Sequence, residues 1–198
     1  MGALRGKIGP VVGSSWMGEP YVRSRGRFRT KKRGLIEKHN QNNFALLHRW
    51  LQPLLPFLKE GFKGYAPRLQ GFKAAKSYGL KHAFVGERGN RVLDPSKLQV
   101  SFGSLPLPSH LGVEKLGRVL QFEWDSAVTE GGSRYDQAML LAYDNESGKY
   151  NWKLTGQFRE AGRDVLELPH APGAYHVYIA FIADDRSRQS HSVYLGRR

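Results

Sequence analysis

A run of basic residues near the start of the chain has residue types and spacing that suggest a chemistry. Seven of the eleven residues in this run are basic, namely Arg23, Arg25, Arg27, Arg29, Lys31, Lys32 and Arg33. Arginine carries a permanent charge and a planar fork of donors that matches phosphate oxygens in pairs. The pattern therefore favours binding to nucleic acid or to another polyanion.

The spacing of the arginines adds a geometric argument. From Arg23 to Arg29 an arginine occupies every second position. In an extended backbone alternate side chains share a face, which repeats about every 6.6 Å, roughly two phosphate steps along one nucleic-acid strand. Three aromatic residues close by, Trp16, Tyr21 and Phe28, could stack on bases. We expect no base-sequence specificity, because the sequence has no helix-turn-helix, finger or ribonucleoprotein motif.

Two other interpretations of the basic run stay open. It could dock onto an acidic protein surface, including that of a second copy, or its charges could simply be solvated. A second series of basic residues lies in the region where helices are expected. Such a series is typical of a solvated helix face; alternatively, it could form one basic surface together with the arm. This series consists of Lys59, Lys63, Arg68, Lys73, Lys76 and Lys81.

The charge is distributed unevenly along the chain. The first 100 residues hold 20 Lys and Arg against 5 Asp and Glu, whereas the last 98 hold 11 against 12. This step predicts two parts: a basic hairpin and arm with a helical region over residues 1–96, and a β-sandwich over residues 97–198. The 40% of apolar residues is enough for a folded chain.

The remaining chemistry-bearing residues predict no catalytic or metal site. The chain has no cysteine, and its seven histidines show no metal-ligand spacing. We therefore expect a protein that is not an enzyme and holds no metal or cofactor. No signal peptide or membrane span is evident, so we expect a location in the cytoplasm or in an assembled particle.

The first half of the chain reads as a hairpin followed by short helices. Residues 6–24 predict two extended arms around a turn at Gly13-Ser14-Ser15. Asn42 or Asn43 is a plausible cap for a first helix that ends at Pro53. A second helix is expected from Pro53 to about Lys59, and a third over residues 67–78 with Gly79 as its cap.

After Gly86 the pattern changes to short alternating runs separated by turns. Seven strands are expected, at residues 98–102, 120–124, 138–143, 150–154, 165–168, 175–182 and 193–195. A tryptophan on the second run and a tyrosine near the start of the sixth, Tyr175 or Tyr178, resemble the immunoglobulin or fibronectin type III layout. The absence of a cysteine pair favours the fibronectin version. The expected fold class is thus α+β, with the hairpin, arm and short helices preceding an antiparallel sandwich.

Short motifs spread over the whole chain resemble an uncharacterised bacterial family of unknown function. The motifs are Gly6-Lys7-Ile8-Gly9, Val12-Gly13-Ser14-Ser15-Trp16, Tyr21-Val22-Arg23-Ser24, Gly61-Phe62-Lys63, Ser77-Tyr78, Leu80-Lys81, Gly103-Ser104-Leu105-Pro106 and Ser192-Val193-Tyr194-Leu195-Gly196. The resemblance implies common ancestry, and it brings no catalytic or binding residues with it.

Together these patterns predict a non-enzymatic binding and assembly protein whose basic arm binds nucleic acid or another polyanion. The alternative is a structural subunit of a virion or surface filament, which self-assembles through the arm and the sandwich into a homo-oligomer. A basic arm joined to a β domain suits both.

Overall fold

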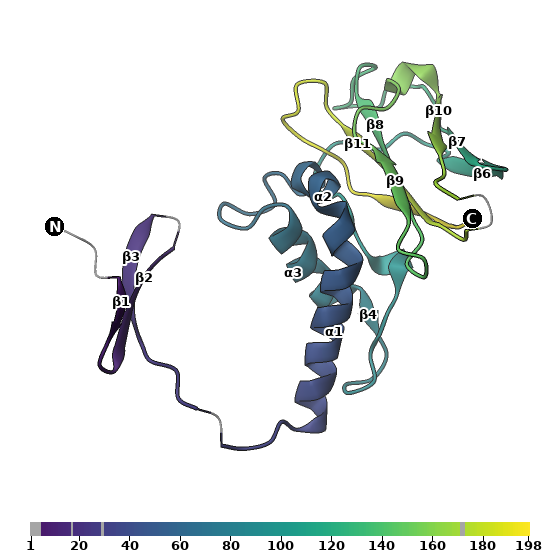
Figure 1. Ribbon diagram of the computed structural model, residues 1–198. Helices are drawn as coiled ribbons and strands as arrows, with labels where there is room; N and C mark the ends of the chain where they lie inside the picture. Colours follow the sequence, from purple (N-terminus) through teal and green to yellow (C-terminus); the bar gives the residue numbers. More distant parts are fainter. Residues whose placement is uncertain (1–4, 17, 29, 171–172) are drawn as a thin grey trace. The chain divides into compact units, whose positions relative to one another are not determined.

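The chain forms two units, Met1–Gly34 and Leu35–Arg198, which we call the N-terminal unit and the main unit (Figure 1). The computed structural model describes residues 5–16, 18–28, 30–170 and 173–198. The boundary that the sequence suggests between residues 96 and 97 lies inside the main unit. The reason is that the helices and the sandwich share a hydrophobic core.

The N-terminal unit contains a three-stranded antiparallel sheet in the order β1-β2-β3. The strands are β1 (Gly6–Ile8), β2 (Val11–Trp16) and β3 (Glu19–Ser24). The prediction of a turn at Gly13-Ser14-Ser15 was wrong, because these residues lie within β2. The chain instead reverses at Gly9 and Gly18, whose φ angles of 56° and 89° are accessible to glycine at little cost.

Of the described arginines in the alternating run, only Arg23 lies in a strand, β3. β3 ends at Ser24, which pairs with Val11 at the start of β2. The amide of Arg25 still donates to the carbonyl of Pro10, at 2.7 Å. Pro10 has no N–H to donate in return, so the ladder of hydrogen bonds stops there. The described residues between Arg25 and Gly34 belong to no strand. Arg25 and Arg27 thus follow the sheet as part of the arm, and Arg29 lies outside the described residues.

The main unit begins with a helical layer. Its elements are α1 (Leu35–Leu51), the 3₁₀ turn η1 (Gln52–Leu54), α2 (Leu55–Gly61) and α3 (Phe72–His82). Two short strands, β4 (Phe84–Val85) and β5 (Val92–Leu93), pair with each other, and a second 3₁₀ turn, η2 (Pro95–Lys97), follows.

Two helix boundaries differ from those expected. α1 starts at Leu35, so Asn42 and Asn43 lie inside it rather than at its cap. The reason is that its apolar spacing marks only the last turns, where Leu47, Trp50 and Leu51 are buried. α3 begins at Phe72 and continues through Gly79 to His82. The break at Pro53 and the end of α2 at Gly61 are confirmed.

Seven strands then build two packed antiparallel sheets, in the orders β10-β7-β6 and β12-β11-β8-β9. They are β6 (Gly112–Leu116), β7 (Val119–Glu123), β8 (Gln137–Tyr143), β9 (Tyr150–Lys153), β10 (Arg163–Glu167), β11 (His176–Ile182) and β12 (Val193–Arg197), with the 3₁₀ turn η3 (Arg159–Ala161) before β10. In chain order the first, second and fifth strands form one sheet, and the third, fourth, sixth and seventh form the other. This is the fibronectin-like arrangement expected.

One expected strand was wrong, and one real strand was missed. Residues 98–102 alternate, but no strand pairs with them. Their backbone instead bonds elsewhere: the amide of Val100 donates to Ser192 Oγ, and that of Phe102 to the carbonyl of Gly61. β6 escaped notice because it is a partly exposed edge strand, in which Glu114 and Lys115 interrupt the apolar pattern.

Two landmark side chains fix the interior of the sandwich. Trp124, directly after β7, is buried and meets the ring of Phe181 edge-on at 5.3 Å. Tyr175, just before β11, donates its hydroxyl to the carbonyl of His170 at 3.2 Å. This bond is the tyrosine corner of such sandwiches. Of the two tyrosines expected for this role, Tyr175 fills it.

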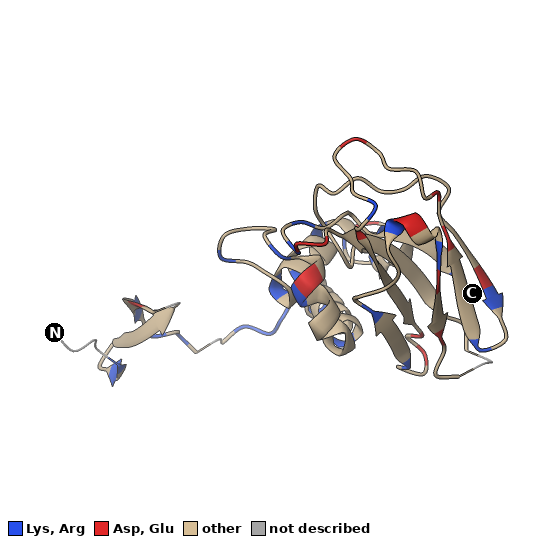
Figure 2. Ribbon diagram, turned by 90° about the horizontal axis from the view of Figure 1, so that it is seen from above, with Lys and Arg blue, Asp and Glu red and all other residues tan. Residues whose placement is uncertain are grey.

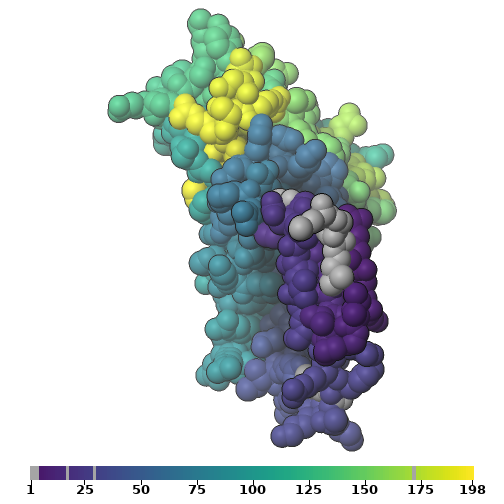
Figure 3. Space-filling model, turned by 90° about the vertical axis from the view of Figure 1, so that its left-hand side faces the viewer, coloured from purple at the N-terminus to yellow at the C-terminus, as the bar shows by residue number. Residues whose placement is uncertain are grey.

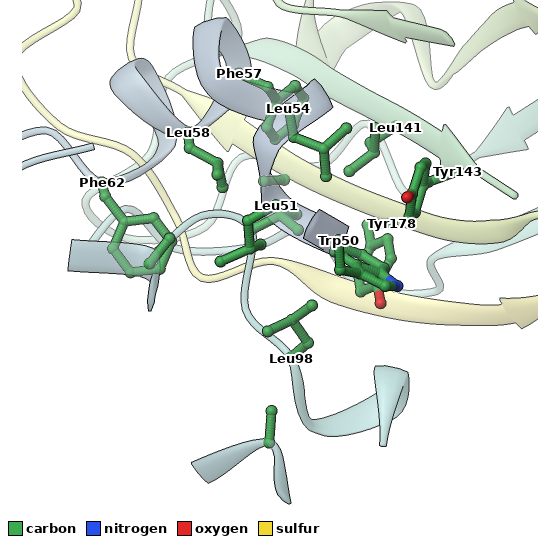
Figure 4. Close-up of a cluster of buried hydrophobic side chains, with 14 of the residues drawn as sticks. Trp50, Leu51, Leu54, Phe57, Leu58, Phe62, Leu98, Leu141, Tyr143 and Tyr178 are labelled. Carbon is green, nitrogen blue, oxygen red and sulfur yellow. The ribbon is translucent and has the colours of Figure 1, made fainter. Parts of the chain in front are cut away.

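The sheet that contains β8 and β11 is buried on both faces. Ala138, Leu140 and Ala142 of β8 point into the sandwich. The residues between them, Met139 and Leu141, pack against the helices, as Figure 4 shows for Leu141. The helical layer and the sandwich therefore form one continuous body, drawn in blue to yellow in Figure 3.

Truncated chains test where the boundary between the two units lies. A chain of residues 35–198 should unfold cooperatively at the same temperature as the full chain, because all described core residues lie within it. A chain of residues 97–198 should lose cooperative unfolding. It would expose side chains worth roughly 1.5–3 kcal/mol each, against a typical domain stability of about 5–15 kcal/mol. Thermal unfolding followed by circular dichroism measures both, and a stable 97–198 fragment would contradict the shared core.

Candidate nucleic-acid interface

The strand register gathers basic residues on one face of the N-terminal sheet. Val12 in β2 lies directly opposite both Lys7 in β1 and Arg23 in β3. Residues directly opposite one another in an antiparallel sheet project their side chains on the same side. Lys7 and Arg23 thus flank Val12 in a single row across the sheet.

Two of the three aromatic residues expected to stack lie on this same face. Tyr21 is opposite Ser14, and Trp16 is opposite Glu19. Their side chains are 44% and 50% exposed, respectively, so a planar group could reach them. We call this set, Lys7, Val12, Ser14, Trp16, Glu19, Tyr21 and Arg23, the cationic-aromatic face. It combines positive charge with ring surfaces, as surfaces that bind single strands do.

The other predicted site residues follow the sheet in the arm. Arg25, Arg27, Lys31, Lys32 and Arg33 are exposed and lie outside regular structure. Phe28 is 89% exposed, whereas Arg29 lies outside the described residues. The structure therefore unites Arg23 with Trp16 and Tyr21, and leaves the remaining described basic residues in the chain that leads to α1.

Lys7 is a candidate residue that sequence reasoning missed. It stands alone between Gly6 and Ile8, and nothing in its neighbours sets it apart. The only signal for it is the pairing of β1 with β2, which brings residue 7 beside residue 12 and so within two strands of residue 23.

The opposite face of the same sheet carries aliphatic side chains and no charged residue among its paired positions. Ile8, Val11 and Val22 alternate with the cationic-aromatic residues, and Ile8 and Val22 are 56% and 58% exposed. Among the described residues of the N-terminal unit no helix or second sheet covers this face. The sheet is thus two-sided, with charge and aromatic rings on one side and aliphatic side chains on the other.

Comparison with protein families matches residues 3–196 to the family of unknown function DUF6266. The chain belongs to this family. No curated protein matches it. Among solved structures it is similar to the fn3 domain of the human collagen alpha-1(XX) chain, with 17% identity and a TM-score of 0.36. That match covers 48% of this chain and 83% of the other.

Two residues of the second basic series contact neighbouring groups of the main unit in this DUF6266 protein. Lys76 lies over the rings of Phe44 and Phe72, at 4.2 and 5.2 Å from their centroids. Lys63 donates to the carbonyl of Arg186 at 2.8 Å. These lysines stabilise local packing, and basic and acidic residues are interspersed over the main unit in Figure 2.

Two buried polar side chains of the DUF6266 sandwich, Arg159 and His176, have partners within the main unit. The guanidinium of Arg159 is fully buried and meets Asp136 Oδ2 at 3.0 Å and the carbonyl of Pro106 at 2.6 Å. Burial lowers the pKa of His176 below its ordinary value, and its Nδ1 lies 2.9 Å from the hydroxyl of Tyr194. These partners all belong to the main unit itself, so the two groups serve its packing.

Clusters of possible metal ligands and long apolar helices are both absent from the part of the chain that the structure describes. Within residues 5–16, 18–28, 30–170 and 173–198, no group of three or more histidine, aspartate or glutamate side chains could hold a metal ion. The helices of this part of the chain also include none long and apolar enough to cross a membrane.

Proposed function

We propose that this DUF6266 protein is a non-enzymatic binding protein whose N-terminal unit binds nucleic acid along its phosphate backbone, without sequence specificity. The observation that carries the proposal is the cationic-aromatic face, on which Lys7 and Arg23 share a surface with Trp16 and Tyr21. The arginine-rich arm follows directly and continues the positive surface.

Charge density supports a polyanionic partner. Residues 1–34 contain nine Lys and Arg and a single acidic residue, Glu19. Such a concentration of one sign repels itself in the free protein, and contact with closely spaced phosphates relieves the repulsion. Bound cations of the nucleic acid are released at the same time, which adds to the affinity.

The exposed rings favour nucleic acid over an acidic protein surface. Every base has a flat face, so stacking on Trp16 or Tyr21 adds affinity for any sequence. An acidic protein surface offers the arginines their charge partners, but it has no regular supply of flat faces. Single-stranded nucleic acid exposes its bases and is therefore the form that we expect to bind most tightly.

Salt dependence tests the role of the arginines. Replacement of Arg23, Arg25, Arg27 and Arg29 by Gln should flatten the dependence of log affinity on log salt for a mixed-sequence single strand. The slope should fall by up to about 0.7 for each phosphate that an arginine no longer neutralises. Fluorescence anisotropy of a labelled oligonucleotide at several salt concentrations measures it.

The matched control removes the same charge from the main unit. Replacement of the exposed Lys38, Lys73, Lys81 and Lys149 by Gln also lowers the net charge by four. It should leave the slope nearly unchanged. Equal slopes for the arginine variant and the unmodified protein would refute the assignment to this segment.

Tryptophan fluorescence tests stacking on the cationic-aromatic face. Trp50 and Trp124 are buried, and Trp16 is the half-exposed member of the four tryptophans. Binding of a single strand should quench the emission, and Trp16→Leu should abolish most of the quenching. The same substitution should weaken binding by about 1–3 kcal/mol. Quenching that persists in Trp16→Leu would place the contact elsewhere.

The apolar face favours a second candidate function, as a self-assembling structural subunit of a virion or filament. A three-stranded sheet gains little stability alone, so cover for Ile8, Val11 and Val22 would stabilise it. A second copy of the chain can supply that cover, and the cationic-aromatic face stays accessible on the other side.

Self-assembly has its own measurement. In nuclease-treated protein, sedimentation should show association that increases with concentration, and Val22→Lys should abolish it because a charge cannot be buried there without a partner. Val128→Lys, at a similarly exposed valine of the main unit, is the control. A protein that stays monomeric at the highest attainable concentration would exclude this second function.

A further inference from the structure

The main unit contains a hollow of about 500 Å³. It lies between the loop that follows α2, the segment at residues 102–104 and the connection from β11 to β12. The residues that line it are Lys63, Gly64, Tyr65, Phe102, Gly103, Ser104, Ser187, Arg188, Gln189 and His191. The helical layer and the sandwich both contribute, and binding sites often form between such layers.

Aromatic rings form one side of the hollow. The ring of His191 lies against Phe102 at a centroid distance of 4.2 Å, and Tyr65 meets Phe102 edge-on at 5.1 Å. All three belong to the lining. The rings are inclined to one another and partly exposed, so a planar ring system can stack on the face of one of them, such as Tyr65.

A buried amide supplies a hydrogen-bond acceptor. Gln189 is 3% exposed, and its Nε2 donates to the carbonyls of Lys63 and Phe102, at 2.7 and 2.8 Å. These two bonds fix the orientation of the amide. Its Oε1 makes no hydrogen bond within the described part of the chain, so it stays available to a donor in the hollow.

The wall around Gln189 is held rigidly. A Cβ on Gly103 would lie 2.0 Å from the carbonyl oxygen of Gln189, so only glycine allows this close approach. Beside it, Ser101 Oγ donates to the carbonyl of Ser190 at 2.7 Å. A preformed wall of this kind lowers the entropy cost of binding a ligand.

The rim of the hollow is positively charged. Lys63 and Arg188 both line it. Lys63 Nζ donates to the carbonyl of Arg186 at 2.8 Å, and Arg188 Nη2 donates to the carbonyl of Gly131 at 2.5 Å. No carboxylate is among the lining residues. Asp185 in the neighbouring turn accepts bonds from the amide and hydroxyl of Ser187 instead.

We propose that this hollow binds a nucleotide whose base carries an exocyclic amino group. The base stacks against Tyr65, its amino group donates to Gln189 Oε1, and Lys63 and Arg188 hold the phosphate. The same chemistry occurs in a free nucleotide and in one nucleotide of a strand. The proposal is independent of the function proposed for the N-terminal unit, because no residue is shared between the two sites.

The test uses the full chain and adenosine 5′-monophosphate as the probe. Titration of ¹⁵N-labelled protein should shift the amides of Gly64, Gly103, Ser104 and Gln189 with one common binding curve. Adenosine, which lacks the phosphate, and purine riboside 5′-monophosphate, which lacks the amino group, should each bind about tenfold more weakly. Shifts confined to the N-terminal unit, or equal affinity for all three compounds, would overturn the proposal.

Substitutions locate the site. Lys63→Gln and Tyr65→Leu should each weaken binding about tenfold, because each removes one charged or one stacking contact. Lys73→Gln, an exposed lysine outside the lining, is the matched control and should have no effect. Lys63 is itself exposed, so this variant stays informative even where Tyr65→Leu fails to fold. Equal effects of Lys63→Gln and Lys73→Gln would refute the assignment.

Two further experiments distinguish binding in the hollow from binding to the N-terminal unit. Replacement of Arg23, Arg25, Arg27 and Arg29 by Gln should leave the affinity for the mononucleotide unchanged, and a tenfold decrease would overturn the proposal. The same variant is then titrated with a short oligoadenylate. Tighter binding of the oligoadenylate than of the mononucleotide identifies one nucleotide of a strand as the ligand, whereas equal affinity identifies the free nucleotide. An oligoadenylate and a mononucleotide that both fail to shift the lining amides would exclude the site.

Discussion

The rest of the structure depends on the burial of one sheet on both of its faces. β8 and β11 alternate residues such as Leu140, which faces the sandwich, and Leu141, which faces the helices. Because both faces need cover, neither layer can leave without exposing the other's core. This constraint joins residues 35–198 into a single unit and fixes where the helices, the loop after α2 and the connection from β11 to β12 must meet.

The N-terminal unit is free of that constraint. None of its described residues belongs to either core, and its sheet has two exposed faces of opposite character. Residues 1–34 contain nine basic residues, and the described ones are exposed and belong to neither core, so their charges stay hydrated. The N-terminal unit can therefore carry the charge that we assign to polyanion binding, while the main unit has a hollow of its own.

Much of the fold could be predicted from local patterns, and the failures have identifiable causes. Six of the seven sandwich strands coincide with alternating runs, and Tyr175 stands where a tyrosine corner requires one. Residues 98–102 alternate equally well, yet the amides of Val100 and Phe102 donate to the hydroxyl of Ser192 and the carbonyl of Gly61, and no strand forms there. β6 forms although its pattern is weak, because β7 offers it a complete set of partners. Local periodicity records burial, whereas strand formation depends on a neighbouring strand with which the backbone can pair.

By itself the sequence determined the class of fold, the fibronectin-like sandwich and the position of the basic run, because these follow from composition and from period-two alternation. The tertiary structure alone decided which residues share a surface. Lys7 joins Arg23 through the register of three strands, and Gln189 meets Lys63 and Phe102 through packing between layers. The physical reason is that such contacts arise from pairing across long separations, which no window of neighbouring residues contains. The distribution of charge along the chain thus marked the region that we assign to polyanion binding. The register of the sheet decided which of its basic and aromatic residues lie on the same face.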